Sequence, residues 1–159
     1  MMQGVYKTIV VGTDGSELAE TTVRRASWVA LQENAELIIV CAYKDMSFRV
    51  GAKARHKGSA AQAGQVYGKK AARAAMNMAI DSARETGAVI AGALLIDGDA
   101  AESLLETAES READLMVIGG LRDRWIGGRL LGDVAGDVLR RANCDVLMVV
   151  HPTEVTAEH

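Results

Sequence analysis

The stretch DLMVIGGLRDRWIGGRLLGDVAGDVLRRANCDVLMVV, residues 114–150, decides the fold, because two apolar runs of strand length flank a run with helical spacing. In that central run, Val134, Val138 and Ala142 recur at the spacing of one helix face. The connection from the first apolar run to this helix is far longer than the roughly 2 to 6 residues usual for such loops. Loops that long in a compact domain are usually functional. We therefore expect a strand, a functional loop, a helix and a second strand.

Short runs rich in Val, Ile and Leu recur along the whole chain, at residues 7–12, 36–43, 89–95, 114–119 and 145–150. They are continuously apolar and do not alternate with polar residues. Such runs are typical of strands that are buried on both faces of a parallel sheet.

Helical patterns lie between these runs. The apolar stripes of the four expected helices are Ala19, Val23, Ala26 and Ala30; Ala72, Met76, Ala79, Ile80 and Ala83; Ala101, Leu104, Leu105 and Ala108; and Val134, Val138 and Ala142. Ser16 and Asp99 are suited to cap the first and third helices, and Gly87 is suited to end the second. The alternation of strands and helices predicts an α/β fold, an open parallel sheet with helices on both faces. We expect residues 1–159 to form a single domain.

Composition places the chain among ordinary soluble globular proteins. It has 159 residues, 49% hydrophobic residues, a net charge of −3 and no apolar run near the roughly 20 residues of a membrane span. No export signal is recognisable at the amino terminus, so the expected location is the cytoplasm, without a membrane partner. Cys41 and Cys144 form no C-x-x-C pair and the three histidines form no ligand motif, so we expect no metal site of the protein's own.

The charge is unevenly distributed. Residues 44–73 contain eight Lys or Arg and one acid, and are therefore +7, whereas the remainder of the chain is −10. A basic segment of this kind can face phosphate, nucleic acid or an acidic partner. No aromatic residues are interleaved with it in a nucleic-acid-binding pattern, so we favour a solvated surface and expect no nucleic-acid partner.

A ligand site is expected where the winding of the sheet reverses, beyond the carboxyl ends of the first and fourth strands. The sequence GTDGS, residues 12–16, lies at that edge after the first strand, and Gly119 and the long loop lie there after the fourth. Glycines permit close approach of a ligand to the main chain, and the amino-terminal end of the helix after Asp133 favours an anion. These features predict a nucleotide site.

Three standard nucleotide or catalytic motifs are absent from the sequence. G-x-G-x-x-G does not follow the first strand, and neither G-x-x-x-x-G-K-[ST] nor G-x-S-x-G occurs. No histidine is expected near the strand ends to activate Ser16 or a cysteine. We therefore expect a binding protein and not an enzyme.

The chain resembles the universal stress protein family over nearly its whole length. The resemblance is carried by YKTIVVGTDGS at the start, by ADLMVIGG at the fourth strand, and by GGRLLGDVAGDVLRRANCDVLMV near the end. It implies a five-stranded, Rossmann-like sheet of order 3-2-1-4-5, resembling the adenine nucleotide alpha hydrolases. It also implies a homodimer joined through the fifth strand, 145–150, whose apolar edge would otherwise be exposed.

Family members that bind ATP carry G-x-x-G, nine residues, and then G-[ST]. On this chain the four positions fall on Gly119, Arg122, Gly132 and Asp133. The resemblance also places Gly12, Thr13 and Asp14 beside the ribose and adenine, and the backbone of Ala42 beside the base. The residues of the predicted nucleotide site are thus Gly12, Thr13, Asp14, Ala42, Gly119, Arg122, Gly132, Asp133 and Val134.

Two positions depart from the motif. Arg122 adds a long side chain that either blocks the expected phosphate site or binds a phosphate through its guanidinium. Asp133 brings a carboxylate that repels phosphate by about 4 kcal/mol at about 4 Å, more than the hydrogen bond of a hydroxyl supplies, unless Mg²⁺ or nearby arginines offset it. Asp133 is also explained as a helix N-cap, and Asp14 as a turn former before Gly15.

Three functions follow from these patterns. The first is a stress-response binding and signalling dimer that admits ATP or another adenine nucleotide with altered phosphate contacts. The second is a family member that has lost nucleotide binding and acts through protein–protein contacts. Slow hydrolysis of ATP is the third, and no dedicated base supports it.

Overall fold

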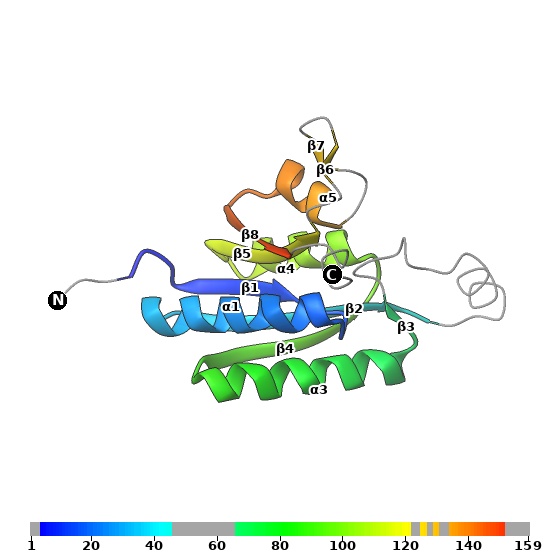
Figure 1. The fold of residues 1–159 in the computed structure, drawn as a ribbon, viewed down its shortest axis with the longest axis horizontal. Coiled ribbons are helices and arrows are strands. Elements are labelled where there is room, and N and C mark those ends of the chain that lie inside the picture. The colour runs from blue at the N-terminus through cyan, green and yellow to red at the C-terminus, as the bar shows by residue number, and fades with distance from the viewer. Residues whose placement is uncertain (1–3, 46–65, 122–124, 127–128, 131–133, 152–159) are drawn as a thin grey trace, which may run out of the picture.

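The computed structural model describes residues 4–45, 66–121, 125–126, 129–130 and 134–151 of the chain, in twelve elements (Figure 1). In chain order they are β1 (Thr8–Gly12), α1 (Glu17–Glu33), β2 (Glu36–Lys44), β3 (Val66–Tyr67), α3 (Lys69–Thr86), β4 (Val89–Asp97), α4 (Ala100–Ser110), β5 (Leu115–Leu121), β6 (Trp125–Ile126), β7 (Arg129–Leu130), α5 (Val134–Arg141) and β8 (Asp145–His151). All five predicted strands and all four predicted helices are present.

The main sheet is parallel, and its long strands lie in the order β4-β2-β1-β5-β8. Counted along the chain, these five strands have the expected order 3-2-1-4-5, so the predicted α/β class is confirmed. The sheet has six strands, however, and the expectation of five was wrong. The sixth, β3, is only two residues long and pairs with Tyr43 and Lys44 at the end of β2. So short a strand leaves no hydrophobic period that a sequence pattern can detect.

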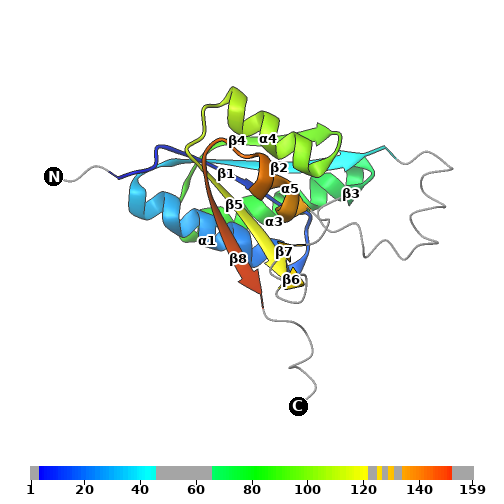
Figure 2. The ribbon, with the colours of Figure 1, turned by 90° about the horizontal axis from the view of Figure 1, so that it is seen from above.

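Two hydrophobic cores lie on opposite faces of the sheet. Ile9 and Val11 of β1 pack with α1 and α3 on one face, whereas Val10 packs with α4 and α5 on the other. Figures 1 and 2 show this three-layer arrangement, with β5 and β8 side by side at one margin of the sheet. Because successive side chains of a strand point to opposite faces, a continuously apolar run such as 8–12 supplies both cores.

The predicted helix boundaries are confirmed where the structure describes them. The Ser16 hydroxyl accepts a hydrogen bond of 3.1 Å from the Ala19 N–H, and an Asp99 carboxylate oxygen accepts one of 3.1 Å from the Glu102 N–H. Gly87 ends α3 with φ of 98°, a conformation that favours glycine. The cap predicted at Asp133 lies outside the described residues.

The predicted apolar stripes face the sheet. Most of their residues are buried, and Ile80, Leu105, Val134 and Ala142 are partly buried at the margins of the cores. Cys41 is buried and Cys144 partly buried, and both are free thiols. Within the described ranges, no helix combines the length and the apolar character needed to cross a membrane.

The basic segment 44–73 lies largely outside the described residues. Its described cationic members, Lys44, Lys69, Lys70 and Arg73, are exposed. Three of these side chains belong to the first two turns of α3.

Candidate functional site: a pocket at the ends of β1 and β5

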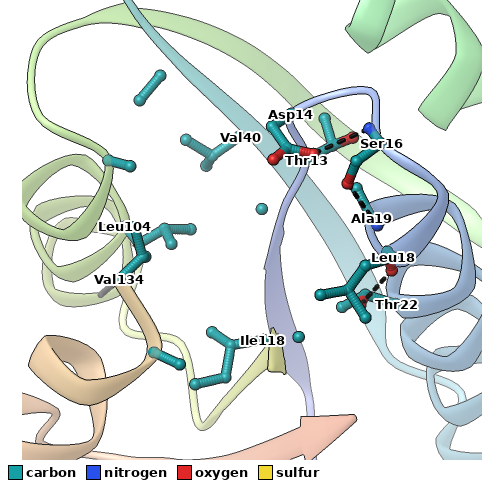
Figure 3. Close-up of a pocket in the computed structure, with 15 residues that line it drawn as sticks. Thr13, Asp14, Ser16, Leu18, Ala19, Thr22, Val40, Leu104, Ile118 and Val134 are labelled. Carbon is teal, nitrogen blue, oxygen red and sulfur yellow. Dashed lines mark hydrogen bonds between the residues drawn. The ribbon is translucent and has the colours of Figure 1, made fainter. Parts of the chain in front are cut away.

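A pocket opens beyond the carboxyl ends of β1 and β5, where helices from both faces of the sheet meet (Figure 3). It encloses about 660 Å³ of free space, including its mouth toward solvent. The position is the one expected for an open parallel sheet, because β2 follows β1 toward one margin whereas β5 lies on the other side of β1.

The pocket brings together six of the nine residues predicted for the nucleotide site, namely Gly12, Thr13, Asp14, Ala42, Gly119 and Val134. They come from the ends of β1, β2 and β5 and from the start of α5. The other three predicted residues, Arg122, Gly132 and Asp133, lie outside the described residues.

The polar part of the pocket is the turn from Thr13 to Ser16. The Thr13 N–H donates to the Val40 carbonyl at 2.9 Å, so this turn continues the pairing of β1 with β2 for one residue. The Gly15 N–H donates to the Thr13 hydroxyl at 3.3 Å, and the Ser16 N–H donates to a carboxylate oxygen of Asp14 at 2.9 Å. Gly15 adopts φ of 85°, a left-handed conformation that suits glycine.

These bonds determine what the turn can offer a ligand. The N–H groups of residues 13, 15 and 16 are satisfied within the protein, so they are not donors for an anion. Main-chain donors for a phosphate, which the sequence places in the loop beyond the fourth strand, are therefore not supplied by these three groups of the turn. Asp14 lies beside Thr13 at the edge of the pocket (Figure 3) and supplies carboxylate oxygens, which accept hydrogen bonds from hydroxyl or amino groups.

The remaining wall is mostly apolar. Val40, Leu104 and Ile118 point toward the same space, as Figure 3 shows, and Val134 completes the wall from the start of α5. Such a lining suits the faces of a flat heteroaromatic ring, which is stabilised by burial. A nucleotide combines a ring of this kind with ribose hydroxyls, and the pocket offers surfaces for both.

Several lining residues were not predicted, among them Leu18 and Thr22 of α1, Val40, Ala100, Leu104 and Ile118. One local signal could have indicated a strand residue. Val40 lies two positions before Ala42 and so on the same side of β2. The helix residues could not be found in this way, because their approach depends on how α1 and α4 pack on the sheet.

The thiol nearest to this turn is not a nucleophile. Cys41 is fully buried, and burial raises its pKa from 9.0 to about 11, with a smaller contribution from the Asp14 carboxylate. A thiol with such a pKa remains protonated at neutral pH and is chemically inert. Among the described residues that line the pocket, Asp14 is the only one with an ionisable acidic or basic side chain.

The sheet order, the helices on both faces and the strand-end pocket define a doubly wound α/β protein with a pocket at the switch point of its sheet. The family model described as the Universal stress protein family matches residues 5–150, and the chain belongs to that family.

Individual relatives agree with this assignment. Universal stress protein Rv1636 of Mycobacterium tuberculosis is 36% identical over 148 residues, which cover 93% of this chain and 98% of the relative. Universal stress protein MJ0531 of Methanocaldococcus jannaschii is 32% identical, over 94% of this chain and 85% of the relative.

A solved structure of a universal stress protein in complex with cAMP is also similar. It superimposes with a TM-score of 0.67 and 34% identity, over 91% of this chain and 97% of that protein. A universal stress protein of Archaeoglobus fulgidus in complex with dAMP has a TM-score of 0.59 but only 20% identity, and supports the fold alone.

Proposed function

We propose that this protein is a stress-response binding protein that holds an adenine nucleotide in the pocket between β1 and β5, without chemical turnover. The observation that carries the proposal is the pocket itself, which joins an apolar wall to Asp14 at the switch point of the sheet. The relative in complex with cAMP, which is 34% identical to this chain, supports the choice of an adenine nucleotide.

The electrostatics of the turn favour a nucleotide of low charge. A phosphate about 4 Å from a carboxylate is repelled by about 4 kcal/mol per charge pair at a surface-like dielectric. Asp14 already places one carboxylate at the pocket, and three neighbouring N–H groups are engaged within the protein. A cyclic nucleotide, which carries a single negative charge, therefore suits this turn better than ATP. A ribose hydroxyl donates naturally to the Asp14 carboxylate.

The phosphate contacts are proposed to come from the loop that follows β5. Gly119 lies in β5, two residues before the strand ends, and the sequence predicts that Arg122, Gly132, Asp133 and the start of α5 at Val134 take part with it. Arg122 supplies a guanidinium for the phosphate, and Asp133 adds a second carboxylate that again disfavours ATP. If ATP is the ligand, Mg²⁺ is required to offset this repulsion.

We further propose a cytoplasmic homodimer that pairs through β8. This strand pairs with β5 on one side. Val150 is 41% exposed, although it belongs to an apolar strand. Pairing with β8 of a second copy would cover this edge.

The proposal is tested by calorimetric titration of protein freed of carried-over ligand with cAMP, AMP and ATP, each with and without Mg²⁺. We expect saturable binding of cAMP, with weaker binding of ATP that improves when Mg²⁺ is added. Absence of heat and of a thermal shift with all three would leave the alternative of a member that acts through protein contacts alone. Phosphate release above a heat-denatured control would contradict the absence of turnover.

A further inference from the structure

Gly119 lies in β5, two residues before that strand ends at Leu121, and packs against helix α1. A Cβ atom built on Gly119 would lie 2.5 Å from Oγ1 of Thr22, 3.0 Å from Cγ of Leu18 and 3.2 Å from its Cδ1. No positive φ occurs at Gly119, so an alanine there is excluded by lack of space and not by backbone conformation. The packing of α1 therefore requires a residue without a side chain at position 119, whether or not a ligand is bound.

Thr22 is held firmly in the position that creates this contact. Its side chain is 2% exposed, and its hydroxyl donates a hydrogen bond of 2.7 Å to the Leu18 carbonyl, one turn earlier in α1. That bond fixes the rotamer of Thr22, and the surrounding core leaves little room for another. Figure 3 shows Thr22 and Leu18 together on the side of the pocket that α1 forms.

We propose that Thr22 is a positioning residue of the nucleotide site: its packing against Gly119 fixes the part of β5 that lines the pocket, two residues before the strand ends at Leu121. The effect on nucleotide affinity rests on the proposed function, whereas the contact itself does not. Close packing of α1 on β5 thus requires glycine at position 119, independently of any approach of a phosphate to its main chain.

A weaker contact on the other face provides an internal comparison. A Cβ atom on Gly12, at the end of β1, would lie 3.2 Å from both Cδ atoms of Leu104 in α4. These atoms are the far end of a flexible side chain, which can move by a few tenths of an ångström. Gly12→Ala is therefore expected to cost less than Gly119→Ala, although both glycines line the same pocket.

The test compares wild type, Gly119→Ala, Thr22→Ala, Thr22→Val and the two double variants by thermal unfolding and by titration with cAMP. Gly119→Ala is expected to lower the unfolding midpoint by roughly 5 °C, a typical cost of overpacking. It is also expected to raise the Kd for cAMP about tenfold, because a binding site tolerates only about 0.5 Å of misplacement.

The two double variants distinguish steric crowding at Gly119 from the loss of the Thr22 hydroxyl. Thr22→Ala removes the crowding atoms and is expected to restore most of the midpoint and affinity lost in Gly119→Ala. Thr22→Val removes the hydroxyl but keeps its bulk, and is expected to restore neither. If Gly119→Ala alone does not fold, recovery of folded protein by Thr22→Ala but not by Thr22→Val gives the same answer.

Two results would overturn the inference. In one, Gly119→Ala leaves the unfolding midpoint at the wild-type value. In the other, Thr22→Ala and Thr22→Val change the effect of Gly119→Ala equally. If wild type binds no nucleotide, the proposed function fails, but the comparison of unfolding midpoints still decides whether Thr22 and Gly119 are coupled. If the unfolding midpoints show that Thr22 and Gly119 are coupled but Gly119→Ala binds cAMP with wild-type affinity, the positioning role is wrong. The contact then contributes to packing alone.

Discussion

A carboxylate oxygen of Asp14 accepts a hydrogen bond of 2.9 Å from the N–H of Ser16, and the Ser16 hydroxyl in turn caps helix α1. The residue that faces the pocket therefore also shapes the turn that starts the helix. This relationship allows the proposed binding role of Asp14 to be separated from its structural role by two substitutions, one that keeps an acceptor for the Ser16 N–H and one that removes it.

Asp14→Asn retains an acceptor for the Ser16 N–H, whereas Asp14→Ala removes it. We expect Asp14→Asn to unfold within about 0.5 kcal/mol of wild type, and Asp14→Ala to lose about 1 kcal/mol. Both are expected to weaken cAMP binding about tenfold, since a charge-assisted bond to ribose is lost. Urea unfolding and calorimetry measure the two effects. Wild-type affinity in Asp14→Asn would mean that Asp14 only forms the turn.

The cap itself can be tested at Ser16. Ser16→Ala leaves an N–H of the first turn of α1 without its partner, and we expect it to lower the free energy of unfolding by about 1 kcal/mol. Ser16→Asn, which keeps a capping oxygen, is the matched control and should be nearly neutral. Equal losses in the two variants would show that the Ser16 hydroxyl does not contribute through its bond to Ala19.

The sheet and its helices could be predicted because their signals are local. Continuous apolar runs such as 36–43 indicate strands buried on both faces, and Ser16, Gly87 and Asp99 mark helix ends through bonds to residues nearby in the chain. The position of Asp14 and Gly119 at one pocket followed from the rule that ligands lie at the switch point.

Other features depend on contacts between distant segments. The contact of Thr22 with Gly119 exists only because α1 packs over β5. The hydrogen bond of the Thr13 N–H depends on β2, which supplies the acceptor, the Val40 carbonyl. The strand β3 forms because the end of β2 extends beyond its pairing with β1. None of these leaves a periodic pattern in the sequence.

Stability at alkaline pH should depend on Cys41. Folding raises the pKa of this thiol from 9.0 to about 11, so between these pH values the folded protein keeps a proton that the unfolded chain releases. Its contribution is fully present below about pH 9 and is lost as pH rises toward 11. We expect the free energy of unfolding in urea to fall between about pH 9 and about pH 11, and to fall less in Cys41→Ala. Parallel pH profiles of the two proteins would contradict this.

The proposed dimer can be tested at the two margins of the sheet. Val150 of β8 and Val89 of β4 are both exposed, at 41% and 64%. Val150→Lys is expected to give monomers in sedimentation or light-scattering measurements, because a charge is placed in the proposed interface. Val89→Lys carries the same change at the opposite margin and should remain dimeric. A monomeric wild type, or loss of the dimer in Val89→Lys alone, would argue against pairing through β8.

The altered phosphate motif proposed for this chain predicts that ATP binding can be gained. Restoring the family pattern with Arg122→Gly and Asp133→Ser removes a bulky side chain and a carboxylate from the expected phosphate seat. We expect the double variant to bind ATP at least tenfold more tightly than wild type in calorimetry, since relief of one repulsion of about 4 kcal/mol outweighs the loss of the Arg122 guanidinium. Unchanged weak binding would show that ATP is excluded for another reason.

The central claim, that the pocket between β1 and β5 binds an adenine nucleotide, is tested most directly by mapping amide chemical shifts during a titration with cAMP. We predict saturable changes concentrated at Gly12–Ser16, Ala42, Gly119 and the start of α5 around Val134. Saturable changes confined to other parts of the chain, or no changes up to millimolar cAMP, would contradict it.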